Sequence, residues 1–300
     1  MAAKQTNELR GTLRQQESKA RHTSWRAGGA ADVYYQRADI DDLAMYLRCL
    51  SVVEPVYWIG LGSNLLVRDG GLNGTVIATS PGLNGLDFLA DNQVWVEAGV
   101  ASPKLARETA KRGLTGMEFL CGIPGTVGGA LALNAGALGS ETWQRVVSVQ
   151  TIDRQGQLHQ RTPDEYEISY RQVKGPAEEW FVAATLQLEQ GDSAASLEMI
   201  KRYLARRSAT QPTQLPNAGS VFRNPPQDYA ARLIEVCGLK NTCVGGACVS
   251  EKHANFIINT GTATAGDIET LIDRVAETVK REHGVELIRE VHIVGEPGGD

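Results

Sequence analysis

Two glycine-rich segments carry residue types suited to holding a phosphorylated ligand. Residues 60–65 read GLGSNL, and residues 122–130 read GIPGTVGGA and are followed by NAGA at 134–137. Glycines let backbone amides approach an anion closely, and a pyrophosphate between two nucleosides needs several such donors along an open path. Either segment alone is equally well explained by tight turns and close packing. Two of them in one chain favour an extended dinucleotide cofactor.

The first glycine segment only half matches the fingerprint of a Rossmann dinucleotide site. Leu65 stands where GxGxxG has its last glycine. The residues that follow, VRDGG at 67–71, do not form the amphipathic helix that the fingerprint opens. A Rossmann domain is therefore not expected.

The cysteines and histidines form no local metal or dithiol motif. The five cysteines have no CxxC spacing, and the five histidines form no HxH or HxxH cluster. We expect reduced, mostly buried thiols and no metal, although ligands distant in sequence could still converge in the fold. The cysteines are Cys49, Cys121, Cys237, Cys243 and Cys248.

Length, charge and hydropathy favour a cytoplasmic globular protein. The chain has 300 residues, of which 42% are hydrophobic, enough for two or three lobes, and its net charge is -5. Because basic residues are scattered among acidic ones, nucleic-acid binding is not expected. No apolar run reaches the roughly 18 residues that cross a bilayer, and residues 1–21 are polar and mixed in charge, so we expect neither a membrane anchor nor a secretory signal.

Short elements are predicted around the glycine segments. Residues 39–50 have helical spacing, and residues 56–59 form a strand that ends at Gly60. Ser102 and Pro103 predict the N-cap and first turn of a helix over 103–112. Further strands are predicted over 65–67, 75–78 and 94–98, and antiparallel strands over 146–152, 157–160 and 181–188.

The C-terminal part has a different character. A change in pattern places a lobe boundary near residue 191, and a helix that ends at the basic residues Arg206 and Arg207 follows it. Thr264 and Gly284 predict the two ends of a helix with an apolar face. A final strand is expected over 286–294, with Leu287, Arg289, Val291 and Ile293 on one face and Ile288, Glu290, His292 and Val294 on the other.

Several ordered motifs resemble one enzyme family. They are TSWRAGG at 23–29, GLGSNLLVRDGGL from 60, GIPGTVGGALALNAGA from 122, Tyr170-Arg171, AGSVFRNP at 218–225, VSEKHANF at 249–256 and Glu290-Val291. In this order they resemble the UDP-N-acetylenolpyruvoylglucosamine reductase (MurB) family from about Thr23 to Val294. The short spacing between Arg171 and the strand at Phe181 is similar to the family's second type, which lacks an extra substrate-covering loop.

The resemblance implies an α+β fold. It consists of an FAD-binding module of the vanillyl-alcohol-oxidase (PCMH) type with an additional α/β substrate-binding lobe. The expected parts are FAD subdomain 1 at 1–80 with 286–300, FAD subdomain 2 at 81–191 and a substrate domain at 192–285.

The resemblance also implies the activity. NADPH would pass a hydride to non-covalent FAD, and the reduced flavin would reduce UDP-N-acetylglucosamine enolpyruvate to UDP-N-acetylmuramate. This reaction belongs to peptidoglycan precursor synthesis, and through cell-wall biogenesis it bears on cell shape and division. The expected partner is this small-molecule substrate, and the expected oligomeric state is a monomer or weak homodimer.

Three residues match the family's catalytic positions. Ser220 would donate the proton, because a weak acid can protonate a strongly basic carbanion-like centre. Arg171 would stabilise the developing negative charge of the substrate carboxylate through its planar, permanently charged fork. Glu290 would hydrogen-bond near the reacting carbons or tune the proton donor. Without the resemblance, these would be read as a turn hydroxyl, a surface arginine and a solvated glutamate.

Other positions match the family's binding motifs. Those expected to bind the cofactor are Gly60, Gly62, Ser63, Asn64, Leu65, Gly122, Pro124, Gly125, Thr126, Gly128, Gly129, Asn134, Ala135 and Gly136. Those expected to bind the substrate's phosphates and uracil, or the nicotinamide nucleotide, are Arg223, Asn224, Lys252, His253 and Asn255.

Two other functions remain as alternatives. One is an oxygen-using oxidase of the same superfamily, with Cys121 or His22 bonded covalently to the flavin. The other is a nucleotide-binding sensor without turnover. The presence of Arg171, Ser220 and Glu290 together argues against a sensor, because a pure binder needs no proton donor.

Overall fold

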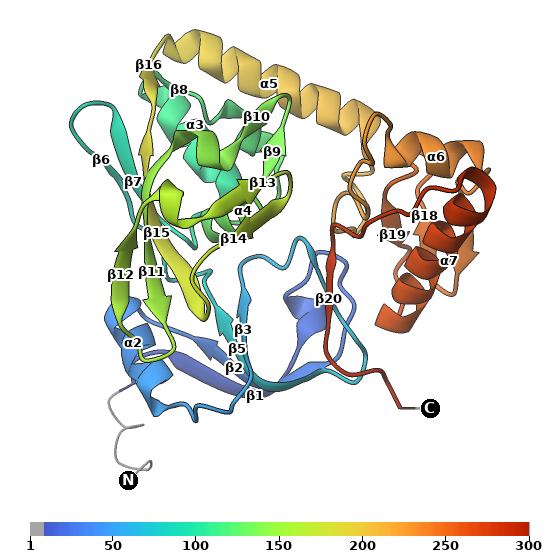
Figure 1. The fold of residues 1–300 in the computed structure, drawn as a ribbon, viewed down its shortest axis with the longest axis horizontal. Helices are drawn as coiled ribbons and strands as arrows, with labels where there is room; N and C mark the ends of the chain where they lie inside the picture. The colour runs from blue at the N-terminus through green and yellow to red at the C-terminus, as the bar shows by residue number, and fades with distance from the viewer. Residues whose placement is uncertain (1–8, 300) are drawn as a thin grey trace. The chain divides into compact units, whose positions relative to one another are not determined.

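The computed structural model describes residues 9–299, which divide into two compact units (Figure 1). Within the described residues, unit 1 comprises 9–14, 33–60 and 74–204, and unit 2 comprises 15–32, 61–73 and 205–299. The division falls inside helix α5 (Ser193–Thr210), between residues 204 and 205, whereas the boundary was predicted near 191. It also differs from the three predicted parts, because residues 61–73 and 286–299 belong to unit 2.

Unit 1 is built on a five-stranded sheet with the order β12-β11-β15-β7-β6. All neighbouring pairs are antiparallel, which confirms the predicted pairing in the middle of the chain. The strands are β6 (Leu86–Phe88), β7 (Gln93–Glu97), β11 (Val146–Asp153), β12 (Leu158–Arg161) and β15 (Glu179–Gln187).

Helices α3 (Ser102–Lys111) and α4 (Val127–Ala132) share one hydrophobic core with this sheet. The predicted N-cap of α3 is one residue off: Ala101 holds the cap position without a side-chain bond, and Ser102 is the first helical residue. The predicted close of this helix at Gly113 agrees with its φ of 69°. Core residues include Val94, Leu105, Leu120, Leu131, Val149 and Leu186.

A second sheet has the order β1-β2-β5-β3, and β3 and β5 are parallel. Its strands are β1 (Thr12–Ser18), β2 (Ala30–Gln36), β3 (Val56–Ile59) and β5 (Leu72–Ala78). Helix α2 (Ile40–Cys49) matches the predicted helix, and its N-cap Asp39 accepts a hydrogen bond from Asp42 N at 2.9 Å. Leu43 and Leu47 of α2 are buried with Ile77 in the same core cluster.

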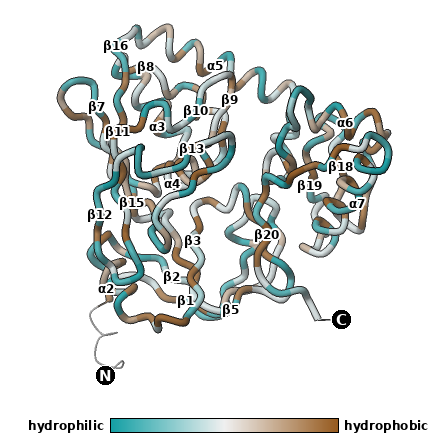
Figure 2. Tube along the Cα trace, viewed as in Figure 1, coloured by the Kyte–Doolittle hydropathy of each residue, from teal (hydrophilic) through white to brown (hydrophobic). Residues whose placement is uncertain are grey.

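Helix α7 (Ala265–His283) dominates unit 2 and confirms the predicted caps. Thr264 Oγ1 accepts from Asp267 N at 3.0 Å, and Gly284 ends the helix at a φ of 69°. Hydrophobic and hydrophilic residues alternate along the helix (Figure 2), and its apolar face is buried. Unit 2 also contains α6 (Ala230–Val236) and a sheet of β17 (Cys243–Val244), β18 (Ala247–Val249) and β19 (Ile257–Asn259).

The expected C-terminal strand is much shorter than predicted. Only β20 (His292–Val294) is regular, and it pairs in parallel with β4 (Leu65–Val67). Before it, residues 288–290 bond irregularly to residues 221–223, with a single bridge between Phe222 and Arg289. The predicted two-face alternation therefore fails: Arg289 is exposed, whereas Leu287 and Val291 are buried.

The expectation that all cysteines are reduced is wrong for one pair. Cys243 and Cys248 lie directly opposite each other on β17 and β18 and form a disulfide with an S–S distance of 2.05 Å. Cys49, Cys121 and Cys237 are free thiols. Hairpin pairing brings the two together although their spacing matches no dithiol motif.

The remaining short strands lie in unit 1. They are β8 (Leu114–Thr115), β9 (Gly136–Ala137), β10 (Ser140–Glu141), β13 (Glu167–Ser169), β14 (Gln172–Lys174) and β16 (Glu189–Gln190). Among residues 9–299, no helix combines the length and the apolar character that a membrane span requires.

Candidate functional site

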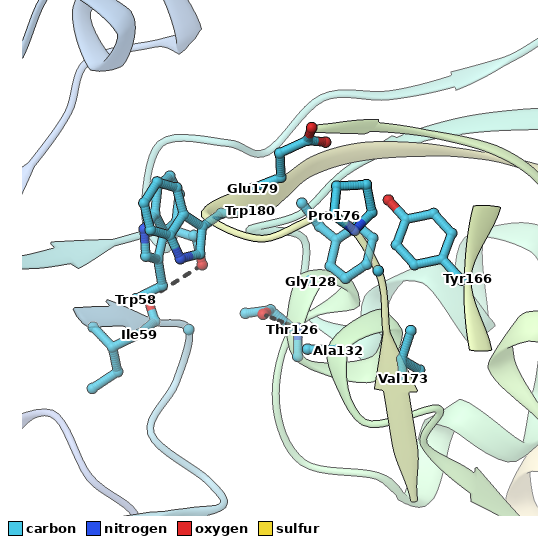
Figure 3. A pocket seen from close by; sticks show the side chains of 15 residues that line it. Trp58, Ile59, Thr126, Gly128, Ala132, Tyr166, Val173, Pro176, Glu179 and Trp180 are labelled. Atoms are coloured by element: carbon cyan, nitrogen blue, oxygen red, sulfur yellow. Dashed lines mark hydrogen bonds between the residues drawn. The ribbon is translucent and has the colours of Figure 1, made fainter. Parts of the chain in front are cut away.

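Unit 1 contains a cavity of about 320 Å³ (Figure 3). It lies where the end of β3, the first turns of α4, the open end of the β13–β14 hairpin and the start of β15 meet. Four predicted cofactor residues line it, namely Gly60, Thr126, Gly128 and Gly129. The other lining residues are Trp58, Ile59, Thr79, Ala132, Tyr166, Val173, Gly175, Pro176, Glu179, Trp180 and Phe181.

Gly60, directly after β3, packs closely against Thr126, the N-cap residue of α4, because it has no side chain. A Cβ at Gly60 would lie 2.5 Å from Thr126 Oγ1 and 3.1 Å from its Cγ2. Thr126 is buried, and its hydroxyl accepts a hydrogen bond from Gly129 N at 3.4 Å at the start of α4. Gly60 is therefore required by close packing, independently of any ligand.

The adjacent glycines Gly128 and Gly129 differ in environment. Gly128 N donates to Ala98 O at 2.8 Å, and a Cβ on Gly128 would lie 2.9 Å from Ala98 Cβ, so this residue serves packing. A Cβ on Gly129 would meet Thr126 Oγ1 first, at 3.8 Å. Packing thus leaves room for a side chain at position 129, a residue that lines the cavity.

Two buried polar atoms of the cavity wall lack a partner. Among the described residues, neither Trp58 Nε1 nor the Tyr166 hydroxyl has a hydrogen-bond partner. Burial raises the pKa of Tyr166 to about 12, so its hydroxyl is protonated at neutral pH. Trp58 stacks on Trp180 with ring centroids 5.1 Å apart.

The cavity has little free charge. Glu179 is the one charged residue among its described lining, and its carboxylate accepts from Arg161 Nη2 at 2.5 Å and Thr151 Oγ1 at 2.6 Å. The hydrogen bond from Arg161 lowers the pKa of Glu179 and keeps it ionised within that pair. The wall therefore suits an uncharged, flat group that can accept hydrogen bonds.

The end of the second glycine segment is held by internal contacts. Asn134 is buried, and its Nδ2 donates to Glu141 Oε2 at 2.8 Å and to Ser169 O at 3.2 Å. Its Oδ1 accepts from Trp143 N at 3.2 Å. The side chain of Asn134 therefore shapes this loop. The predicted cofactor residues that do not line the cavity are Gly62, Ser63, Asn64, Leu65, Gly122, Pro124, Gly125, Asn134, Ala135 and Gly136.

Arg171 lies at the tip of the β13–β14 hairpin with a φ of 56°. Its guanidinium donates to Gly136 O at 2.6 Å and to Asn134 O at 3.4 Å. It is also 4.9 Å from the ring centroid of Tyr170. The structure thus brings the predicted arginine to the end of the predicted glycine segment within unit 1.

Unit 2 brings together three predicted residues that are far apart in sequence. Val221, next to Ser220, accepts a hydrogen bond through its carbonyl from Glu290 N at 2.8 Å. Asn64 Nδ2 donates to Glu290 O at 3.0 Å, and Asn64 O accepts from His292 N at 3.1 Å. The half-buried Ser220 and Glu290 therefore lie on neighbouring segments.

Asn255 positions the segment that carries Ser220. It is 3% exposed, its Oδ1 accepts from Phe222 N at 3.0 Å, and its Nδ2 donates to Phe222 O at 2.8 Å. Asn255 O also accepts from Val221 N at 2.9 Å. Its amide is thus engaged with the backbone, whereas sequence reasoning assigned it to the substrate.

The other predicted substrate residues surround this segment. Asn224 Oδ1 accepts from Ala230 N at 3.1 Å at the start of α6, and Lys252 Nζ donates to Ser208 O. His253 Nδ1 accepts from Asn255 N at 3.3 Å, and burial lowers the pKa of His253. Arg223 differs, because its buried Nε has no hydrogen-bond partner among the described residues.

Sequence reasoning missed the aromatic wall of the cavity. Trp58 stands two residues before Gly60, so its place beside the glycine turn was visible in the sequence. Tyr166 and Trp180 come from more than 100 residues later and carry no comparable local signal.

A possible cation site forms where α6 and α7 end. Ligand atoms of Cys237, Glu282 and His283 lie within 4.8 Å of one another, a convergence that the local spacing did not reveal. Arg281 already pairs with Glu282 at 3.1 Å, and burial raises the pKa of Cys237, which disfavours the thiolate that a metal needs. The trio therefore gives no support for a metal.

Comparisons with known proteins agree with one another over nearly the whole chain. Residues 31–161 match the model of an FAD binding domain, and residues 211–294 match that of the UDP-N-acetylenolpyruvoylglucosamine reductase C-terminal domain. The chain is 56% identical to the UDP-N-acetylenolpyruvoylglucosamine reductase of Nitrosococcus oceani over 96% of this chain and 97% of that one. It is 57% identical to that of Alkalilimnicola ehrlichii over 95% and 96% of the two chains.

A solved structure shares the fold. The crystal structure of UDP-N-acetylenolpyruvylglucosamine reductase (MurB) from Thermus caldophilus is 31% identical, with a TM-score of 0.81, over 95% of this chain and 98% of that one. This similarity and the FAD-binding match confirm the predicted α+β fold with an FAD-binding module.

Proposed function

Because the chain belongs to the UDP-N-acetylenolpyruvoylglucosamine reductase family, we propose that it reduces UDP-N-acetylglucosamine enolpyruvate to UDP-N-acetylmuramate. It is an FAD-dependent oxidoreductase. We further propose that NADPH is the source of the hydride and that the enzyme acts in peptidoglycan precursor synthesis. The observation that carries this proposal is the backbone linkage between the Ser220 segment and Glu290 in unit 2.

The residues of the cavity fit FAD. Gly129 leaves space for a ligand, and the unsatisfied atoms of Trp58 and Tyr166 need acceptors. Gly60 and Thr126 form the adjoining wall. When bound, FAD supplies the acceptance and donation of hydride, while the protein supplies binding and orientation.

The side chains proposed for catalysis have distinct tasks. Hydride addition to the enolpyruvyl group builds negative charge on the neighbouring carbon and its carboxylate. Arg171 would stabilise this charge, because its guanidinium is always protonated. Ser220 would deliver the proton from its Oγ. Glu290, on the neighbouring segment, would orient the serine or the substrate.

The structure argues against the oxidase alternative. Cys121, one candidate for a covalent flavin bond, is 2% exposed and lies in the core of unit 1. His22, the other candidate, has its Nε2 2.8 Å from Glu17 Oε1. We therefore propose that the FAD is non-covalent, which acid precipitation with release of free flavin would test.

An anaerobic stopped-flow experiment tests the proposed reaction. NADPH should bleach the flavin absorbance near 450 nm, and UDP-N-acetylglucosamine enolpyruvate should then restore it. Ser220→Ala should bleach normally but recover at least about 100-fold more slowly, the usual effect of losing a positioned proton donor. A colourless protein that cannot be loaded with FAD would refute the assignment, and recovery with oxygen alone would favour the oxidase.

A further inference from the structure

Ser220 lies in an irregular stretch of unit 2. Between the end of α5 at Thr210 and the start of α6 at Ala230, the chain forms no helix or strand. Residues 211–219, which lead to the serine, read QPTQLPNAG, and residues 213–215 are exposed. Because no helix or sheet holds this backbone, the position of the Ser220 hydroxyl depends on the hydrogen bonds that individual side chains make to it.

The side chain of Asn217 makes three such bonds. Its Nδ2 donates to Leu215 O at 2.7 Å and to Pro212 O at 3.0 Å, and its Oδ1 accepts from Gly219 N at 3.0 Å. The bond to Gly219 is an Asx turn, in which a side-chain oxygen takes the place of a backbone carbonyl. One partly buried amide therefore closes the loop and also sets the direction of the chain just before Ser220.

The residue between Asn217 and the serine's own peptide adds little stiffness. Gly219 has a φ of 78°, and a Cβ on it would meet nothing within 4 Å. Glycine has the greatest backbone freedom, so packing at position 219 does not fix the serine. On the other side, Val221 N donates to Asn255 O at 2.9 Å. Ser220 thus lies between two anchored amides, one of which is held by the Asn217 side chain.

Other contacts keep this loop attached to unit 2 without the Asn217 amide. Ala218 is 3% exposed and belongs to the hydrophobic core of the unit. Asn259 N donates to Pro216 O at 2.9 Å. Because neither contact uses the Asn217 side chain, removing that side chain should change the direction of the chain at Gly219 without detaching the loop.

Resting on the proposed function, we propose that Asn217 is a positioning residue for the proton donor. By holding Gly219 N, its Oδ1 directs the Ser220 hydroxyl toward the carbon that receives the proton. In that step the O–H bond of Ser220 breaks, a C–H bond forms at the carbanion-like carbon left by hydride addition, and the serine regains a proton from water. Asn217 neither gains nor loses a proton, and reduction of the flavin by NADPH does not need it.

A double-mutant cycle in the anaerobic stopped-flow assay tests this role. The forms are wild type, Asn217→Ala, Ser220→Ala and the double variant, with Thr213→Ala as an exposed control in the same loop. Asn217→Ala should bleach with NADPH at the wild-type rate and recover with the enolpyruvyl substrate at least about tenfold more slowly, because a displacement of about 1 Å can cost 100-fold. In the Ser220→Ala background it should change recovery by less than about twofold, because it acts only through the serine. The control should match wild type.

Asn217→Asp separates the two halves of the amide. Aspartate keeps an acceptor for Gly219 N but cannot donate to Pro212 O or Leu215 O. Both Asn217 variants lose the Nδ2 bonds, so their melting temperatures should fall by similar, small amounts. Recovery in Asn217→Asp should nevertheless stay within about threefold of wild type, while Asn217→Ala remains slow.

Four outcomes would overturn the inference, each in a different way. Effects of Asn217→Ala and Ser220→Ala that add fully would indicate that Asn217 contacts the substrate itself. Slow bleaching of Asn217→Ala would place it with the cofactor. Recovery in Asn217→Asp as slow as in Asn217→Ala would assign the effect to loop closure through Nδ2. Failure of the wild type to recover with substrate would refute the proposed function, and the role of Asn217 with it.

Discussion

Replacing Asn255 with alanine tests whether its side chain positions the backbone near Ser220 or contacts the substrate. The amide of Asn255 makes two hydrogen bonds to the backbone of Phe222, at 3.0 and 2.8 Å, in a region that is almost fully buried. Removing it leaves one N–H and one carbonyl unsatisfied, at roughly 1–3 kcal/mol each. We therefore expect a loss of about 2–6 kcal/mol in the free energy of unfolding.

The same substitution should affect turnover through Ser220, which lies two residues before Phe222. Urea unfolding measures the stability loss, and steady-state kinetics at a temperature where the variant is folded should show a lower kcat with a smaller change in KM. Asn224→Ala is the matched control, because Asn224 is exposed and caps α6 through a single bond to Ala230 N, so about 1 kcal/mol is expected. Normal stability with a strongly raised KM in Asn255→Ala would refute the reasoning and restore the substrate contact.

Three other predictions follow from local geometry. Gly60→Ala should destabilise the ligand-free protein by about 1–3 kcal/mol, because its Cβ would overlap Thr126, whereas Gly129→Ala should preserve or raise stability and weaken FAD binding. Thermal unfolding measures the stability and titration with FAD measures the binding, and identical behaviour of the two variants would contradict this prediction. Replacing both Cys243 and Cys248 with serine should lower the free energy of unfolding by up to about 2 kcal/mol, because the disulfide closes only a short loop; a much larger loss in chemical denaturation would exclude that explanation. Burial lowers the pKa of His253, so as the pH falls below the ordinary value of 6.5 the unfolded chain binds a proton before the folded protein does, and the free energy of unfolding should decline. His253→Asn should flatten this decline in a plot of the free energy of unfolding against pH. An unchanged slope would assign the decline to other groups.

Local signals in the sequence were sufficient for several elements. Thr264 and Gly284 mark the ends of α7 because a cap is made by residues within one turn of the helix. The helix after Asp39 and the strand before Gly60 were also predicted from local patterns, namely apolar residues at helical spacing and a short apolar run. The ordered motifs from Thr23 to Val294 indicated the family and its α+β fold.

Tertiary structure alone decided how distant residues are used. Asn64 bonds to Glu290, 226 residues away, and Asn255 bonds to Phe222, 33 residues away. Such partners are chosen by chain topology, which no local spacing encodes. The same limit explains the shortened β20, whose preceding residues bond to residues 221–223 instead of continuing a strand.

The sequence by itself determined the family, the local elements and the residue types available for chemistry. Only the folded chain decided that Gly128 packs while Gly129 opens into the cavity, and that Trp58 and Tyr166 stand there with unsatisfied polar atoms. The physical reason is range: caps, turns and periodicity depend on neighbours within a few residues, whereas burial and hydrogen-bond satisfaction depend on everything that packs around an atom.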